Sequence, residues 1–282
     1  MYKKIGLALV AIILLALLSA CKGTNSADEQ KVVKIGVTGT DGQVWDVVKK
    51  KAAEEGITIE LVEFSDYTLP NKALADGEID LNAYQHIAFL TQFNEEHHLD
   101  LVPIGTTVIA PMGIYSEKYK DVSEIPDGSK IAIPDDPSNQ ARALKLLQSA
   151  GLIKLKEDFG LFGDLSGITE NPKKLEIIPM VAQQTPRALK DVAASVINNG
   201  VAGQAGFVPN KDAIFLEDPN DPAAQPYINI FAARKEDKDN KVFKKIVEIY
   251  HEPEVAEAIK KDTNGGSIVV DLPVEKLEDI VK

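Results

Sequence analysis

Short apolar runs with strand character alternate with amphipathic helical stretches along most of this chain, and this alternation constrains the fold more than any other feature. Residues 57–61 alternate strictly between apolar and polar side chains, as a half-buried strand does. Val44, Val47 and Val48 instead recur at helical spacing. The chain is therefore predicted to be an α/β protein.

The predicted elements fall into two groups. Strands are expected at residues 32–37, 57–61, 79–81, 130–134, 175–180, 194–198 and 228–232, with a long extended run at 101–114 that Pro111 interrupts. Helices are expected at 44–53, 69–75, 87–96, 141–150, 186–191, 242–250 and 254–260. The most economical architecture is two α/β lobes with a cleft between them, crossed at 101–114 and again near 228–233. A single doubly wound sheet is the alternative.

The N-terminus has the pattern of a secretory signal. Lys3 and Lys4 precede an uncharged apolar run over residues 5–18, and Leu18-Ser19-Ala20-Cys21 follows. Such a run is too short for a stable membrane span. The four residues resemble a lipobox, in which the cysteine becomes the lipidated first residue of the mature protein. We therefore expect a signal peptide at 1–20 and a lipidated tether at 21–31, with a plain secretory signal as the alternative.

Charge and cysteine content exclude several classes of function. The net charge is −12, and removal of residues 1–20, which contain two lysines, changes it to −14. Such acidity argues against binding to nucleic acid or electrostatic adhesion to anionic lipid. Because Cys21 is the only cysteine, no intramolecular disulfide and no multi-cysteine metal site can form.

Catalytic motifs are missing from the sequence. It contains no G-x-S-x-G elbow, no phosphate-binding loop and no H-E-x-x-H pair. His97 and His98 are adjacent in a charged stretch, which favours a solvated face. Asp237 and Asp239 lack the rest of a calcium loop. We therefore predict that the protein is not an enzyme and that it binds neither a metal nor a cofactor.

Arginine is rare in this chain, so each arginine is a candidate for anion recognition. The chain has Arg142, Arg187 and Arg234 against 28 lysines. A guanidinium group suits a bidentate carboxylate contact. Arg142 is predicted in the first turn of a helix that opens at Pro137-Ser138-Asn139, where free backbone N–H groups favour an anion. Arg187, also at a predicted helix start, is an equal rival on these grounds.

Aromatic and amide side chains are interleaved at a predicted strand–helix junction. Tyr84, His86 and Phe89 lie close together there, among Asn82 and Gln85. Aromatic residues at this spacing usually belong to a core. The admixture of amides is better suited to the wall of a site for a partly apolar ligand.

Eight segments of the mature chain match one known family pattern. They are Glu63-Phe64-Ser65-Asp66-Tyr67, Leu69-Pro70-Asn71, Asp80-Leu81-Asn82-Ala83-Tyr84-Gln85-His86, Ile133-Pro134-Asp135-Asp136-Pro137-Ser138-Asn139-Gln140-Ala141-Arg142-Ala143-Leu144, Gly151-Leu152-Ile153-Lys154-Leu155, Asn171-Pro172-Lys173, Val196-Ile197-Asn198-Asn199 and Pro226-Tyr227-Ile228-Asn229. Through these segments the whole mature chain resembles the methionine-binding lipoproteins of bacterial ABC importers, the NlpA-like group.

This resemblance implies a two-lobed fold of the periplasmic-binding type (type II-like), with one lobe at 32–112 plus 229–282 and the other at 113–228. It implies capture of L-methionine or a close analogue for a membrane permease, by a protein lipid-anchored on the extracytoplasmic face of the cell membrane. Arg142 takes the place of the carboxylate-binding arginine, ahead of Arg187. The implied ligand-binding residues are Tyr67, Tyr84, His86 and Phe89 as an aromatic pocket, and Asn139, Arg142, Asn198 and Asn229 as polar contacts.

Three segments depart from the common family pattern. Family members usually have Phe-Gln-His-x-Pro-Tyr where this chain has Tyr84-Gln85-His86-Ile87-Ala88-Phe89, so two hydroxyl groups change position. Residues 177–181 replace an acidic stretch, and Gly200-Val201-Ala202 replaces an aromatic one. Two alternatives therefore stay open: another small amino acid or a methionine-containing dipeptide as ligand, and a surface lipoprotein for adhesion or signalling.

The lipobox generates a direct test. Cys21→Ser should abolish lipid labelling and leave unprocessed precursor or released protein, because serine offers no thiol for acylation. Metabolic labelling with a fatty acid and fractionation of cells would measure both effects. Membrane-bound, acylated Cys21→Ser protein would contradict the assignment.

Overall fold

The computed structural model describes residues 31–40 and 42–281. The predicted signal peptide, Cys21 and nearly all of the predicted tether lie outside the described residues. Among the described residues, no helix is long and apolar enough to cross a membrane. The strands of residues 31–281 form two large sheets and one small one.

The first large sheet has six strands in the order β13-β4-β12-β3-β1-β2. β1 pairs in parallel with β3, whereas β12 runs antiparallel to both β3 and β4. The bounds in chain order are β1 (Lys31–Val37), β2 (Ile57–Glu63), β3 (Leu81–Asn82), β4 (Val102–Ile109), β12 (Ile228–Ala233) and β13 (Ile268–Val269).

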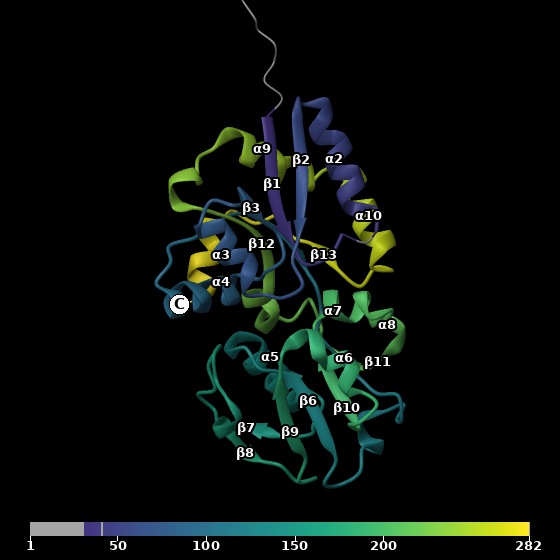
Figure 1. The fold of residues 1–282 in the computed structure, drawn as a ribbon. Coiled ribbons are helices and arrows are strands. Elements are labelled where there is room, and N and C mark those ends of the chain that lie inside the picture. Colours follow the sequence, from purple (N-terminus) through teal and green to yellow (C-terminus); the bar gives the residue numbers. More distant parts are fainter. Residues whose placement is uncertain (1–30, 41, 282) are drawn as a thin grey trace, which may run out of the picture. The chain divides into compact units, whose positions relative to one another are not determined.

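Helices cover both faces of this sheet, as Figure 1 shows. Alternate residues of β12 divide between two cores: Phe231 belongs to one, and Ile230 to the other. On the first face lie α2 (Val44–Glu54), α9 (Lys241–Tyr250) and α10 (Pro253–Asp262), and on the second α3 (Leu69–Ala75), α4 (Ile87–His97) and α11 (Glu275–Ile280). Because helices bury both faces of the sheet, consecutive residues of an interior strand such as β12 are mostly apolar.

The second large sheet has five strands in the order β11-β5-β10-β6-β9. Its bounds are β5 (Gly113–Tyr115), β6 (Lys130–Pro134), β9 (Glu176–Met180), β10 (Ala194–Ile197) and β11 (Ala213–Leu216). The helices of this part of the chain are α5 (Pro137–Ser149), α6 (Thr185–Ala188), α7 (Asn199–Gln204) and α8 (Pro209–Asp212), and β7 (Lys154–Leu155) pairs with β8 (Ile168–Glu170). Leu144 and Leu147 of α5 pack into the core of this sheet.

The chain passes between the two sheets twice, which rules out the single doubly wound sheet. Residues 110–112 lead from β4 to β5, and residues 217–227 lead back from β11 to β12. The predicted extended run at 101–114 is thus two strands, separated where Pro111 cannot donate a hydrogen bond. The predicted return at 228–233 is wrong in detail, because those residues form the interior strand β12. We propose 32–112 plus 229–282 and 113–228 as the two lobes.

Local signals set several helix boundaries. Helix 69–75 was predicted with both of its ends correct, since Pro70 suits a first turn and Gly77, at φ +77°, follows the end. α5 begins at Pro137 with Asp136 as N-cap, whose side chain accepts from the Asn139 N–H. The predicted helix at 186–191 is instead the short α6, which ends at Ala188.

Candidate functional site

All eight residues predicted to contact a ligand line one cavity of about 580 Å³. They come from separate places in the chain. Tyr67 lies before α3, and Tyr84, His86 and Phe89 lie at or near the start of α4. Asn139 and Arg142 belong to α5, Asn198 follows β10, and Asn229 belongs to β12. The structure thus brings the predicted residues together, while their roles toward a ligand stay predictions.

Tyr67, Tyr84, His86 and Phe89 form an aromatic wall. The ring centroids of Tyr67 and Tyr84 are 5.9 Å apart, and each of these rings lies 6.1 Å from the ring of Phe89. His86 contacts Phe89 at 6.2 Å with its ring perpendicular. The Tyr84 hydroxyl donates to the carbonyl oxygen of Tyr67 at 2.7 Å. These edge-to-face and tilted contacts are the arrangements that aromatic rings favour.

A buried set of three amides supports this wall from behind. Asn71, Asn82 and Gln85 are at most 3% exposed. Asn71 and Gln85 exchange hydrogen bonds at 2.8 and 2.6 Å, and the Asn82 amide donates to Asn71 at 2.9 Å. Because buried amides without partners are costly, this network holds Gln85, and with it the turn that carries Tyr84 and His86, in one conformation.

A chain of hydrogen bonds with a fixed direction starts at Asp136. The amide nitrogen of Asn139 donates to both carboxylate oxygens of Asp136, at 3.0 and 3.1 Å. The amide oxygen of Asn139 must therefore accept, and it does so from Asn198 at 2.7 Å. Because the amide nitrogen of Asn198 donates to Asn139, the amide oxygen of Asn198 points elsewhere. That oxygen is buried and has no hydrogen-bond partner within the described chain.

His86, which lies beside the six-stranded sheet, extends this chain of hydrogen bonds. Its Nδ1 accepts from the Phe89 N–H at 3.0 Å, so Nε2 carries the proton and donates to the amide oxygen of Asn139 at 3.2 Å. Burial, and then the positive charge of Arg142, lower the pKa of His86 from 6.5 to about 3, against the opposing effect of the Asn139 hydrogen bond. His86 is therefore neutral at physiological pH.

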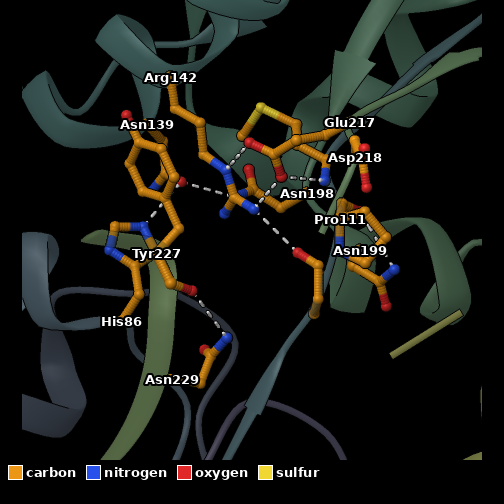
Figure 2. A network of polar contacts seen from close by, with 12 residues as sticks. His86, Pro111, Asn139, Arg142, Asn198, Asn199, Glu217, Asp218, Tyr227 and Asn229 are labelled. Carbon is orange, nitrogen blue, oxygen red and sulfur yellow. Dashed lines mark hydrogen bonds and ion pairs between the residues drawn. The ribbon is translucent and has the colours of Figure 1, made fainter. Parts of the chain in front are cut away.

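The guanidinium of Arg142 is buried and largely engaged by the protein itself (Figure 2). Its Nε donates to Glu217 at 3.0 Å, and its Nη2 donates to Glu217 and, at 2.9 Å, to the carbonyl oxygen of Ala110. The ring of Tyr227 lies 4.3 Å from the guanidinium carbon. Within the described chain, only Nη1 makes no hydrogen bond.

The predicted placement of Arg142 in the first helical turn is wrong. Since α5 begins at Pro137, Arg142 is its sixth residue and lies in the second turn. The first-turn N–H of Asn139 is satisfied by Asp136 rather than free for an anion. Arg142 thus acts through its side chain alone, without the helix terminus.

Glu217, the partner of Arg142, is one functional residue that the sequence did not reveal. It follows β11, 75 residues after Arg142, and no motif or spacing connects the two. The only available signal was indirect: a buried arginine in an acidic chain requires a carboxylate partner.

The other two arginines do not line the cavity. Arg187 is exposed and donates to Gln184 at 3.4 Å, whereas Arg234 donates to the carbonyl oxygens of Leu74 and Ile79 and pairs with Asp237. Within residues 31–40 and 42–281, no three or more His, Cys, Asp or Glu side chains are grouped to hold a metal ion.

Comparison with known proteins identifies the family. The NlpA lipoprotein family matches residues 33–270. This chain belongs to the NlpA lipoprotein family. A relative from Yersinia pestis, named D-methionine-binding lipoprotein MetQ, is 42% identical over 265 residues, which are 93% of this chain and 96% of the relative.

Solved structures of similar proteins have the same fold. The crystal structure of protein PG110 from Staphylococcus aureus is 53% identical, with a TM-score of 0.86 over 88% of this chain and 98% of that one. A nutrient-binding protein from Burkholderia cenocepacia, bound to methionine, is 44% identical, with a TM-score of 0.80 over 84% and 99%. The predictions of family and of a two-lobed α/β fold with a ligand cleft are confirmed.

Burial of His86 should make stability depend on pH. In the unfolded chain its pKa returns to about 6.5, so between pH 6.5 and 3 the unfolded state binds a proton that the folded state excludes. The free energy of unfolding should therefore fall as the pH falls through this range, by up to about 1.4 kcal/mol per pH unit from this group. Urea unfolding of wild type and His86→Gln between pH 7 and 4.5 would measure it.

His86→Gln should remove this part of the pH dependence, because glutamine does not titrate. The exposed His98 provides the matched control, and His98→Gln should follow the wild-type curve. An unchanged slope in His86→Gln would contradict the buried, neutral state of His86.

Proposed function

We propose that this protein captures methionine outside the cytoplasmic membrane and delivers it to the permease of an ABC importer. One observation carries the proposal: a single cavity combines an aromatic wall with a guanidinium nitrogen and a buried amide oxygen that the described chain leaves without partners. Relatives named for methionine binding, and a relative solved with methionine, support the choice of ligand.

The polar end of the cavity suits the two charged groups of an amino acid. Nη1 of Arg142 can donate to a carboxylate, and the free amide oxygen of Asn198 can accept from an ammonium group. Asn229 donates its amide to the carbonyl oxygen of Val108 at 3.2 Å, which leaves its own oxygen as a second acceptor. The buried carboxylate of Asp136 adds negative potential on the ammonium side.

The aromatic wall suits the methionine side chain. A thioether is apolar and polarizable, and each contact between sulfur and an aromatic ring is worth about 0.3–1.5 kcal/mol. Tyr67 also packs against a core cluster that includes Val201 and Ala202 of α7. A charged side chain would lie against these rings without a partner.

The size of the cavity supports a second candidate ligand of the same class. The lining continues past the eight predicted residues to Gln204 of α7 and to Asp262 and Asn264 beside α10. A methionine-containing dipeptide would extend in this direction. An adhesion or signalling lipoprotein has no need of a deep cavity with an unpaired buried acceptor, so this alternative is disfavoured.

Attachment through lipidated Cys21, partnership with a permease and the lack of catalysis belong to the same proposal. The family is one of lipoproteins, and its members here are named for binding rather than for a reaction. Mass spectrometry of the small molecule released from purified protein by denaturation is the most direct test. Methionine or a methionine peptide is expected, and an unrelated compound would overturn the proposal.

Arg142→Ala should weaken methionine binding by about 2–5 kcal/mol, or tens- to thousands-fold, because a buried charge-assisted contact is lost. Calorimetry on refolded, ligand-free protein would measure it, with L- and D-methionine titrated separately and urea unfolding to verify the fold. The exposed Arg187 is the matched control. A loss below about threefold in Arg142→Ala, or an equal loss in Arg187→Ala, would place the anion site elsewhere.

The affinities of a series of amino acids should separate the contribution of the aromatic wall from that of the polar end of the cavity. Norleucine keeps the length of methionine without its sulfur, so it should bind more weakly by about 0.3–1.5 kcal/mol. Glutamate and lysine should be excluded by several kcal/mol, since each would bury an unpaired charge. Quenching of Trp45, which lines the cavity, offers a first readout before calorimetry. Tight binding of glutamate without binding of methionine would refute the proposal that methionine is the ligand.

A further inference from the structure

Glu217 contacts both the Arg142 guanidinium and the main chain of Met112. Its carboxylate takes the edge formed by Nε and Nη2, and one of its oxygens also accepts from the Met112 N–H at 3.1 Å. The backbone N–H of Glu217 donates to the carbonyl oxygen of Met112 at 3.0 Å. The carboxylate is therefore held by the main chain as well as by the arginine.

These contacts lie on the two segments that connect the sheets. Ala110 and Met112 belong to the segment between β4 and β5, and Glu217 opens the segment that leads back to β12. Arg142 reaches both segments from α5: it donates to the carbonyl oxygen of Ala110 and to Glu217, and Figure 2 shows its guanidinium beside Glu217. The rotation of the guanidinium group about its side chain is thus set by the connecting segments.

Glu217 lies behind the arginine rather than in the cavity. Arg142 is among the residues that line the cavity, and Glu217 is not. The side chain of Glu217 is 14% exposed and that of Arg142 only 4%. A ligand carboxylate entering from the cavity therefore meets Nη1, while the Nε–Nη2 edge stays with Glu217.

We propose that Glu217 is a positioning residue for ligand binding: it holds Arg142 so that Nη1 is presented to the carboxylate of the ligand. This inference rests on the proposed function. It predicts an end-on contact through one nitrogen, in place of the bidentate grip expected from the sequence. It also predicts that the effect of Glu217 is confined to ligands that carry a carboxylate.

Glu217→Gln tests the proposal with little change in side-chain volume. A glutamine has only one acceptor oxygen, so it cannot reproduce the two parallel contacts that Nε and Nη2 make with separate carboxylate oxygens, and its amide places a donor against other donors. Methionine affinity should fall by at least about tenfold. Methioninol, which has a hydroxymethyl group in place of the carboxylate, should bind the variant within about twofold of its wild-type affinity. Both ligands are titrated to millimolar concentration by Trp45 fluorescence.

Glu170→Gln is the matched control, since Glu170 forms an exposed ion pair with Lys154 at 2.8 Å in the same part of the chain. It should leave both affinities unchanged. Equal losses for methionine and methioninol in Glu217→Gln would show a merely structural role and overturn the inference. Unchanged or tighter methionine binding would also overturn it. Failure of wild type to bind methionine would instead remove the proposed function, and this inference with it.

Discussion

One amide oxygen, Oδ1 of Asn139, joins the parts of this site that come from different sheets. It accepts from His86, beside the six-stranded sheet, and from Asn198, beside the five-stranded one. All three side chains are less than a tenth exposed, so breaking either bond would strand a buried polar group. The aromatic wall and the polar end are therefore held in register by one acceptor, and Asp136 in turn fixes the direction in which that acceptor points.

The charge of Arg142 is matched before any ligand enters, because Glu217 pairs with it. Asp136 is half-buried and accepts from the neutral side chains of Asn139 and Ser138. Burial raises the pKa of its carboxyl, and the hydrogen bonds from Asn139 and Ser138 oppose that rise. The arginine thus keeps its partner in the protein, whereas the acidic side chain near Asn198 has only neutral donors, and this asymmetry favours an ammonium group on that side of the cavity.

The sequence predicted most elements and the eight residues that line the cavity, because both depend on local signals. Apolar periodicity located α3, α4 and most of α5, and family motifs marked the cavity residues. The missing parts depend on contacts between distant residues. The short strand β13 exists through its pairing with β4, and Glu217 meets Arg142 across 75 residues. The prediction placed Arg142 one turn too early because apolar periodicity begins at 141, whereas the side chain of Asp136 caps a helix that begins at Pro137.

Two of the three departures from the family pattern lie beside the same cavity, which Tyr84, Phe89 and Gly200 line. A hydroxyl at position 84 finds an acceptor in the Tyr67 carbonyl, whereas Phe89, 5% exposed, needs no partner. Tyr67 in turn packs against a core cluster that includes Val201 and Ala202 of α7. The hydroxyl at position 84 and the small residues of α7 are therefore connected through Tyr67, so a change at one of these positions acts on the same part of the cavity as a change at the other.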